Sequence, residues 1–452
     1  MSSQKIIIKV IIIAALVICS IIPLVLIGFI VEDRKGRRAE VENEVSQLWG
    51  EAQEIKGPIM VIPYNEHEKK VESNGKTTEN LIYKYAFFLP DEMKIESELK
   101  PQIRYRDIYE IPVYETSLKF EGKFPFPDIK SLNIDSADVF WDDAYLIASF
   151  SDLRGIKNEI DLQWNNSQNK GNDKLYFLPG LVGLYDFNTG MHVKLPSLRN
   201  RTNDTSYTYS FSLNLNGSRS LSFAPLGKVN NVTIKSNWST PSFSGAFLPS
   251  SRTINKGQFV ANWEITYFGR SYPQQWKSGD NESDIYSKIT NSLSTTELLI
   301  PVDTYQKTSR SVKYGILFIA LTFLTFFLIE ILRKMRIHPL QYLLVGLALT
   351  LFYLLLLSLS EHWNFIYAYI TASAANILLI GTYVFAFLKS RKEGFLLAVV
   401  LIALYGYLYV LLQIENYALL LGSVGLFLIL AFVMFITRKI DWYSVGNQTE
   451  KK

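Results

Sequence analysis

Residues 6–31 read IIIKVIIIAALVICSIIPLVLIGFIV, an apolar run of 26 residues interrupted by one charge, Lys9. A helix of this length crosses a bilayer with some tilt. No small-x-small cleavage site stands out before the charged residues at 32–35, and the run is long for a signal peptide. We therefore interpret residues 1–31 as an uncleaved N-terminal transmembrane helix.

The C-terminal part of the chain repeats this pattern. Residues 315–437 contain five more apolar runs, each near the length that a bilayer demands. Lipid forces every backbone polar group to bond within its own segment, so such runs form helices. The runs are residues 315–332, 340–360, 365–388, 395–412 and 417–436. The sequence thus predicts a six-helix transmembrane part, followed by a tail over residues 438–452.

The charges set the orientation of these helices. The connectors 333–336, 389–392 and 438–439 are basic, whereas 361–364 and 413–416 contain no Lys or Arg. Because basic loops stay on the cytoplasmic side, we expect both termini in the cytoplasm and residues 32–314 outside, in the periplasm of a Gram-negative cell. Residues 32–314 hold 34 basic against 36 acidic residues, so the net charge of +4 comes from helix ends and does not indicate nucleic-acid binding.

The composition excludes two broad classes of protein. Charged residues make up 19% of the chain, against about 25% in soluble domains. This excludes a wholly soluble enzyme and a disordered hub. Cys19 is the one cysteine, so neither an intrachain disulfide nor a cysteine-based zinc site is expected.

The outer region, residues 32–314, has the pattern of a mainly β, sandwich-like domain inserted between the first and second transmembrane helices. Apolar residues alternate over 207–215, an Asn216-Gly217 pair follows, and alternation resumes at 221–223, which predicts a hairpin. We expect further strands at 83–89, 108–114 and 258–268, and a helix at 40–52 leading away from the membrane. The size fits one large β-sandwich or two smaller ones.

Motifs for catalysis and for cofactors are missing from the sequence. It contains no Walker phosphate loop, no dinucleotide-binding glycine pattern after a strand, no zincin motif and no serine-hydrolase elbow. The four histidines, His67, His192, His338 and His362, lie far apart in sequence. We therefore predict no catalytic residue, no cofactor and no metal site.

Two clusters in the outer region are candidate partner-binding sites. Asp152 and Arg154 form a polar binding corner or a simple turn ion pair, and the ion pair is favoured because exposed pairs are common. The uncharged run 238–249 is a loop that grips a partner or an ordered loop that closes a sandwich edge. The candidate partner-binding residues are Asp152, Arg154, Ser242, Phe243, Ser244, Phe247 and Arg252.

A third set of polar residues lies where helices leave the membrane. Charged groups deep in lipid would indicate an ion or proton path, but these lie at span ends, which favours interfacial anchoring. No span has the glycine or proline break of a transporter site. The candidate interface cluster is Asp303, Arg310, Lys313, Glu361, His362 and Glu415.

Longer phrases of the sequence resemble the CreD family of bacterial inner-membrane, cell-envelope integrity proteins, nearly end to end. They are RDIYEIPVY (106–114), SDLRGI (151–156), PSFSGAFLP (241–249), PVDTYQ (301–306), RSVKYG (310–315), IHPLQYLLVG (337–346), LSLSEH (357–362), NYALLLGS (416–423) and TRKIDWY (437–443). The resemblance implies a role in envelope integrity, in tolerance of some colicins and in a two-component response that includes β-lactam stress. It carries no catalytic residues.

Three hypotheses follow. The first is a non-enzymatic inner-membrane protein that supports envelope integrity and stress tolerance, with the lipid bilayer around its helices and an envelope protein or cell-wall polymer bound by its outer domain. The alternative is a membrane enzyme or transporter that acts on an envelope lipid or small molecule at the outer face of the helix bundle. The third is a structural scaffold for a multiprotein complex.

Overall fold

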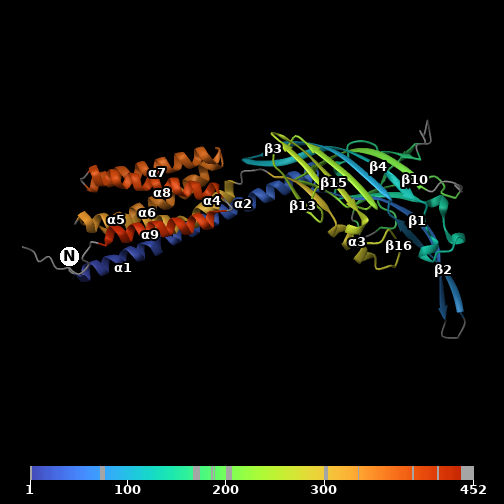
Figure 1. The fold of residues 1–452 in the computed structure, drawn as a ribbon, viewed down its shortest axis with the longest axis horizontal. Coiled ribbons are helices and arrows are strands. Elements are labelled where there is room, and N and C mark those ends of the chain that lie inside the picture. The colour runs from blue at the N-terminus through green and yellow to red at the C-terminus, as the bar shows by residue number, and fades with distance from the viewer. Residues whose placement is uncertain are drawn as a thin grey trace, which may run out of the picture. The chain divides into compact units, whose positions relative to one another are not determined.

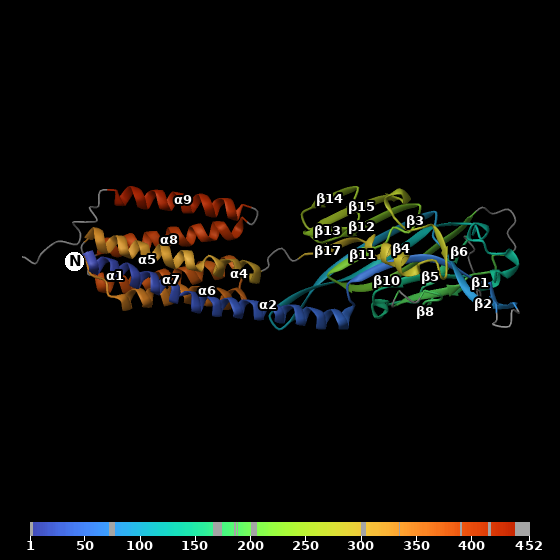
Figure 2. The same ribbon diagram turned by 90° about the horizontal axis from the view of Figure 1, so that it is seen from below.

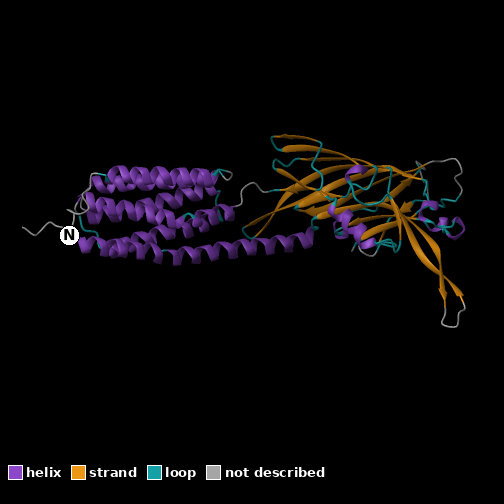
Figure 3. Ribbon diagram, turned by 60° about the horizontal axis from the view of Figure 1, so that its bottom comes forward, coloured by secondary structure: helices purple, strands orange, loops and turns teal. Residues whose placement is uncertain are grey.

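The computed structural model describes residues 3–71, 77–165, 174–184, 187, 189–199, 206–299, 304–333, 335–388, 391–414 and 417–438. The chain divides into two compact units. Met1–Glu40 with Val302–Lys452 form the helix unit, and Val41–Pro301 form the β unit. Figure 3 shows helices gathered in the first and strands in the second.

Six helices of the described residues are long and apolar enough to cross a membrane, as the sequence predicts. The first span is built from α1 and α2, and the other five are α5 to α9 (Figure 1). The helices are α1 (Ser3–Cys19), α2 (Ile21–Trp49), α3 (Glu282–Asn291), α4 (Thr304–Lys313), α5 (Gly315–Arg333), α6 (Pro339–Ser360), α7 (Phe365–Leu388), α8 (Arg391–Gln413) and α9 (Ala418–Thr437).

Helix α2 continues well past the apolar run. The sequence suggests an anchor that ends at residue 31 and a separate helix at 40–52, whereas the structure joins them in one helix that ends at Trp49. Residues 32–40 sustain this helix with i,i+3 ion pairs, Glu32 with Lys35 at 3.3 Å and Arg37 with Glu40 at 3.0 Å.

Helix α6 is central to the helix unit. It contacts α1, α4, α5 and α7, and α7 in turn contacts α8. Phe352 of α6 lies against Tyr369 of α7 and Tyr405 of α8, with ring centroids 5.6 and 4.7 Å apart. Helix α9 lies beside α8 (Figure 2), and Ala418 is its one buried residue among those described.

The β unit contains two mixed sheets. The strands are β1 (Gln53–Val71), β2 (Thr77–Phe88), β3 (Glu92–Arg106), β4 (Tyr109–Pro125), β5 (Tyr145–Phe150), β6 (Asp161–Trp164), β7 (Leu175–Tyr176), β8 (Leu178–Pro179), β9 (Gly190–Lys194), β10 (Ser206–Ser218), β11 (Ser220–Phe223), β12 (Val229–Ser236), β13 (Pro241–Gly245), β14 (Ser251–Asn255), β15 (Gln258–Thr266), β16 (Gln275–Lys277) and β17 (Ser294–Leu298). The nine-stranded sheet has the order β13-β17-β11-β1-β5-β9-β8, and off this path β2 pairs with β1 and β16 pairs with β2. The eight-stranded sheet has the order β14-β15-β12-β3-β4-β10-β6-β7.

Both sheets contribute to one hydrophobic core. Ile59 and Phe87 come from the nine-stranded sheet and Phe120 and Trp263 from the eight-stranded sheet, and all four are almost fully buried. Strand β3 alternates exposed and buried residues over its first half, because successive side chains point to opposite faces of a sheet. Residues 41–301 thus fold as one compact unit around this core.

The predicted hairpin at Asn216-Gly217 is wrong. Strand β10 runs straight through these residues, pairing Asn216 with Glu115 and Gly217 with Tyr114. The chain turns only at Arg219, which has a φ of 62°, and β11 then joins the other sheet. Gly217 serves close packing instead, since a Cβ there would lie 2.3 Å from the Tyr114 hydroxyl.

Candidate functional site

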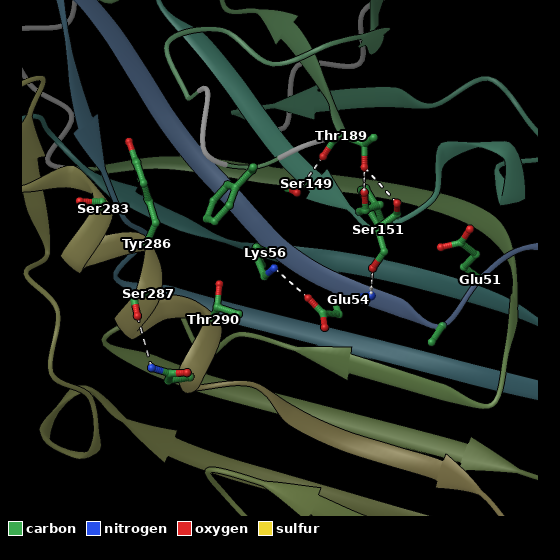
Figure 4. Close-up of a pocket in the computed structure, with 14 residues that line it drawn as sticks. Glu51, Glu54, Lys56, Ser149, Ser151, Thr189, Ser283, Tyr286, Ser287 and Thr290 are labelled. Atoms are coloured by element: carbon green, nitrogen blue, oxygen red, sulfur yellow. Dashed lines mark hydrogen bonds and ion pairs between the residues drawn. The ribbon is translucent and has the colours of Figure 1, made fainter.

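A cleft of about 670 Å³ opens in the β unit between α3 and the strands β1 and β5, and we call it the α3 cleft (Figure 4). Its volume falls in the range of about 300–1,000 Å³ that is usual for small-molecule sites. The lining comes from segments far apart in the sequence, near residues 51–56, 149–151, 187–189 and 283–291. Only the tertiary fold brings them together.

Helix α3 forms one wall, and its sequence explains why. Ile285, Tyr286 and Ile289 are buried and fix the helix to the core. Ser283, Ser287 and Thr290 are exposed and line the cleft. Residues at i, i+4 and i+7 share one face of a helix, so α3 presents three hydroxyl groups to the cleft.

The sheet forms the opposite wall. Ile55 points into the core, so alternation turns its neighbours Glu54 and Lys56 toward the cleft. The Lys56 ammonium donates to the Glu54 carboxylate at 2.8 Å. Ser151 accepts a hydrogen bond from the Glu54 backbone N–H at 2.6 Å, and the Ser149 hydroxyl donates to the Thr189 carbonyl at 2.8 Å (Figure 4).

Asp152 and Arg154 form a polar corner next to this cleft. The Asp152 carboxylate accepts from the Arg154 Nε at 2.9 Å and from the backbone N–H groups of Arg154 and Glu51 at 3.0 and 3.2 Å. Buried Gln53 donates to the carbonyls of Asp152 and Asn216 at 3.0 and 3.1 Å. Because Glu51 lines the α3 cleft, this corner fixes one end of the cleft wall.

Burial and hydrogen bonding shift the pKa of the Asp152 carboxyl group in opposite directions. Burial alone would raise its pKa, but hydrogen bonds from the side chain and backbone of Arg154, and from the backbone of Glu51, stabilise the carboxylate. The net effect holds the pKa of Asp152 below its usual value. Asp152 is therefore a negative charge fixed in place at neutral pH.

The second predicted cluster is built differently from the expected loop. Residues 241–245 of the run 238–249 form β13, an edge strand paired with β17. Phe243 packs edge-to-face on Phe259 and Trp263, and the Ser244 hydroxyl donates to Glu297 at 3.0 Å. The Phe247 carbonyl accepts from the Trp263 Nε1 at 3.1 Å.

Two further members of this cluster lie on the edges of the two sheets. Ser242 is half-buried in β13, at the edge of the nine-stranded sheet, and Arg252 is exposed on β14, at the edge of the eight-stranded sheet. The contacts of this cluster are with β15 and β17, whereas Asp152 and Arg154 bond to Glu51, just before β1. The structure therefore does not bring the two predicted clusters together.

The described members of the predicted interface cluster lie at one end of the helix unit. Glu361 accepts from the Tyr305 hydroxyl at 3.2 Å and lies 3.7 Å from the Arg34 Nε. Arg310 donates to the Leu411 carbonyl at 3.2 Å. Lys313 and His362 are exposed. Asp303 and Glu415 lie outside the described residues.

The sequence places Glu330 at the end of its span and predicts interfacial anchoring for it, but it does not predict the ion pair that Glu330 forms. Lys9 of α1 bonds to the Glu330 carboxylate of α5 and, at 2.7 Å, to the Ile337 carbonyl. The Tyr342 hydroxyl of α6 donates to Glu330 at 3.2 Å. Glu330 is 4% exposed. The available signal was that Lys9 and Glu330 are lone charges of opposite sign in two apolar runs.

The described residues contain no group of three or more His, Cys, Asp or Glu side chains that could hold a metal ion. Chemically, the α3 cleft offers hydroxyl groups, an amide and ion-paired carboxylates, which suit the binding of a polar ligand.

Comparison with known proteins gives two results. A family model described as "Inner membrane protein CreD" matches residues 5–443. The chain is also 35% identical over 428 residues to "Inner membrane protein CreD" of Escherichia coli (strain K12), an overlap of 95% of this chain and 92% of that relative.

Proposed function

This chain belongs to the CreD family of inner membrane proteins, and from that premise we propose that it supports the integrity of the cell envelope by binding an envelope component through its β unit. The observation that carries the proposal is the α3 cleft, where polar side chains from four segments converge on a volume suited to a ligand. The helix unit is then the anchor that keeps this cleft at the membrane.

The distribution of basic residues supports a periplasmic β unit. The connectors 333–336, 389–392 and 438–439 carry Lys and Arg, and the alternate connectors carry none. By the positive-inside rule, both chain termini lie in the cytoplasm and residues 32–314 in the periplasm. The cleft would then face cell-wall polymers and periplasmic proteins.

The contacts of the cleft favour binding over catalysis. Glu54 is paired with Lys56 and Glu51 with Arg154 at 3.2 Å, so both carboxylates are held by cationic partners. Polar groups held in place in this way can fix the orientation of a bound ligand.

A gene-deletion strain tests this proposal. The strain is complemented with the full-length chain or with a chain lacking residues 41–301. We then measure the leakage of periplasmic enzymes and the survival of cells exposed to cell-wall antibiotics. Membrane fractionation checks that both proteins insert. Rescue by the full-length chain alone is expected, and equal rescue by both would refute a role for the β unit.

One observation favours the rival function, a membrane enzyme or transporter. Lys9 and Glu330 form an ion pair among the spanning helices, and ionisable residues in that position often mark transport paths. Rescue by the chain lacking residues 41–301 would support this rival.

A further inference from the structure

We propose that the α3 cleft binds a neutral oligosaccharide, an inference that rests on the proposed function and names its ligand. The argument uses the charge balance of the cleft, the placement of its hydroxyl groups and its aromatic floor. Each comes from contacts within the β unit.

The charge balance excludes a strongly charged ligand. Lys56 is the one cation among the described residues that line the cleft, and Glu54 neutralises it at 2.8 Å. A phosphate or carboxylate ligand needs a cation available to it, and here it would have to displace Glu54. Glu51 is held in the same way by Arg154, at 3.2 Å, which leaves little attraction for a cation. An uncharged ligand fits both facts.

The hydroxyl groups match the chemistry of a sugar. Ser283, Ser287 and Thr290 stand along one face of α3, and Ser151 and Thr189 lie on the opposite side (Figure 4). A hydroxyl group both donates and accepts hydrogen bonds, as each hydroxyl of a saccharide does. Ser151 Oγ accepts from the Glu54 N–H and keeps its own proton for a ligand, whereas the Thr189 hydroxyl donates to the Phe150 and Ser151 carbonyls and can still accept a hydrogen bond. The two sides of the cleft can therefore bond to a chain of sugar rings together.

Two aromatic residues give the cleft an apolar floor. Phe187 and Tyr286 line it, with ring centroids 5.2 Å apart. Lys56 lies 5.4 Å from the Phe187 ring centroid, which holds the cation against the aromatic face. Phe187 is 6% and Tyr286 4% exposed, so the two rings close the bottom of the cleft with apolar carbon, and the specific contacts with a sugar come from the hydroxyl walls.

The test measures oligosaccharide binding to the full-length chain in lipid nanodiscs, since a maltoside detergent would itself compete. Isothermal titration uses the tetramer of N-acetylglucosamine and, separately, maltotetraose, which lacks the acetamido group. Preference for the first would indicate a cell-wall type of glycan, and binding of the second a plain hexose polymer. Either result supports a neutral saccharide.

A matched pair of variants locates the binding. Ser287→Trp fills the cleft from an exposed position, whereas Lys288→Trp places the same ring on the next residue of α3, outside the cleft lining. We expect Ser287→Trp to weaken binding about tenfold or more and Lys288→Trp to change it by about twofold or less. Thr290→Phe, also in the cleft, serves if Ser287→Trp unfolds the protein.

Three outcomes would overturn the inference: no binding of either tetrasaccharide, binding that Ser287→Trp and Thr290→Phe leave unchanged, or binding of spermine or inorganic phosphate in place of the sugars. If residues 41–301 remain necessary for rescue of the deletion strain while both sugars fail to bind, the proposed function stands and only its ligand is wrong.

Discussion

Replacing Asp152 by alanine is expected to destabilise the β unit strongly. The Asp152 carboxylate is 5% exposed and accepts hydrogen bonds from the backbone N–H groups of Glu51 and Arg154. Both hydrogen bonds are partly buried, so each donor left without an acceptor costs about 1.5 kcal/mol, in the lower half of the ~1–3 kcal/mol for a fully buried group. The Arg154 side chain is 62% exposed, so its ion pair adds little. Two lost acceptors predict a loss of about 3 kcal/mol.

Thermal unfolding of the full-length chain in nanodiscs measures this loss, followed by the fluorescence of buried Trp263 and Trp276. At about 2–4 °C per kcal/mol for a domain of this size, the midpoint should fall by about 6–12 °C. Asp284→Ala is the matched control, because Asp284 is 44% exposed and bonded to Lys288 at 2.6 Å. Its midpoint should fall by about 2 °C or less. Equal shifts for the two variants would refute the reasoning.

The stability that Asp152 contributes should also depend on pH. Because the folded pKa of Asp152 is lowered, its stabilisation is present above the unfolded pKa of about 3.9 and is lost as the pH falls through the folded value. The difference between wild type and Asp152→Ala should be full at pH 7 and shrink below about pH 4. A difference that stays constant to pH 3 would contradict this assignment.

Three other predictions concern packing, the buried ion pair and topology. Gly217→Val should destabilise the β unit by about 1–3 kcal/mol, because the Tyr114 ring fills the space into which the valine side chain would extend. An unchanged midpoint of thermal unfolding would contradict this prediction. Lys9→Met or Glu330→Leu alone should lower the free energy of unfolding by about 3–5 kcal/mol, whereas the double variant should recover most of that loss. Thermal unfolding in detergent measures these losses, and additive losses in the double variant would contradict the prediction. For the topology, the native cysteine is replaced by serine and one new cysteine is introduced. Asn364→Cys should react with an impermeant maleimide from the periplasmic side, and Arg336→Cys should react only after the inner membrane is permeabilised. The reverse labelling would contradict the predicted topology.

The sequence alone was enough to locate the membrane spans. The predicted run 365–388 is helix α7 to the residue, and the other C-terminal runs differ from their helices by a few residues at one or both ends. The physical reason is that lipid offers no hydrogen bonds, so a long apolar segment has to satisfy its backbone within its own helix. That requirement is local and can be read without knowing the rest of the fold.

Strand pairing could not be read in the same way. Asn216-Gly217 has the local chemistry of a hairpin turn, yet β10 continues through it because β4 pairs with it along its whole length and the Tyr114 ring needs the space at Gly217. A turn signal is a local preference, and pairing across a sheet outweighs it.

In the candidate sites too, contacts between neighbours in sequence could be predicted and contacts between distant segments could not. The contact between Asp152 and Arg154 could be anticipated, since the two residues are neighbours in one turn. Lys9 and Glu330 are 321 positions apart, and the α3 cleft takes its walls from four distant segments. The sequence by itself determined the membrane-spanning helices, through a local demand of the bilayer. Only the tertiary structure decided which side chains meet, because burial in a shared core fixes contacts between segments that no local pattern relates.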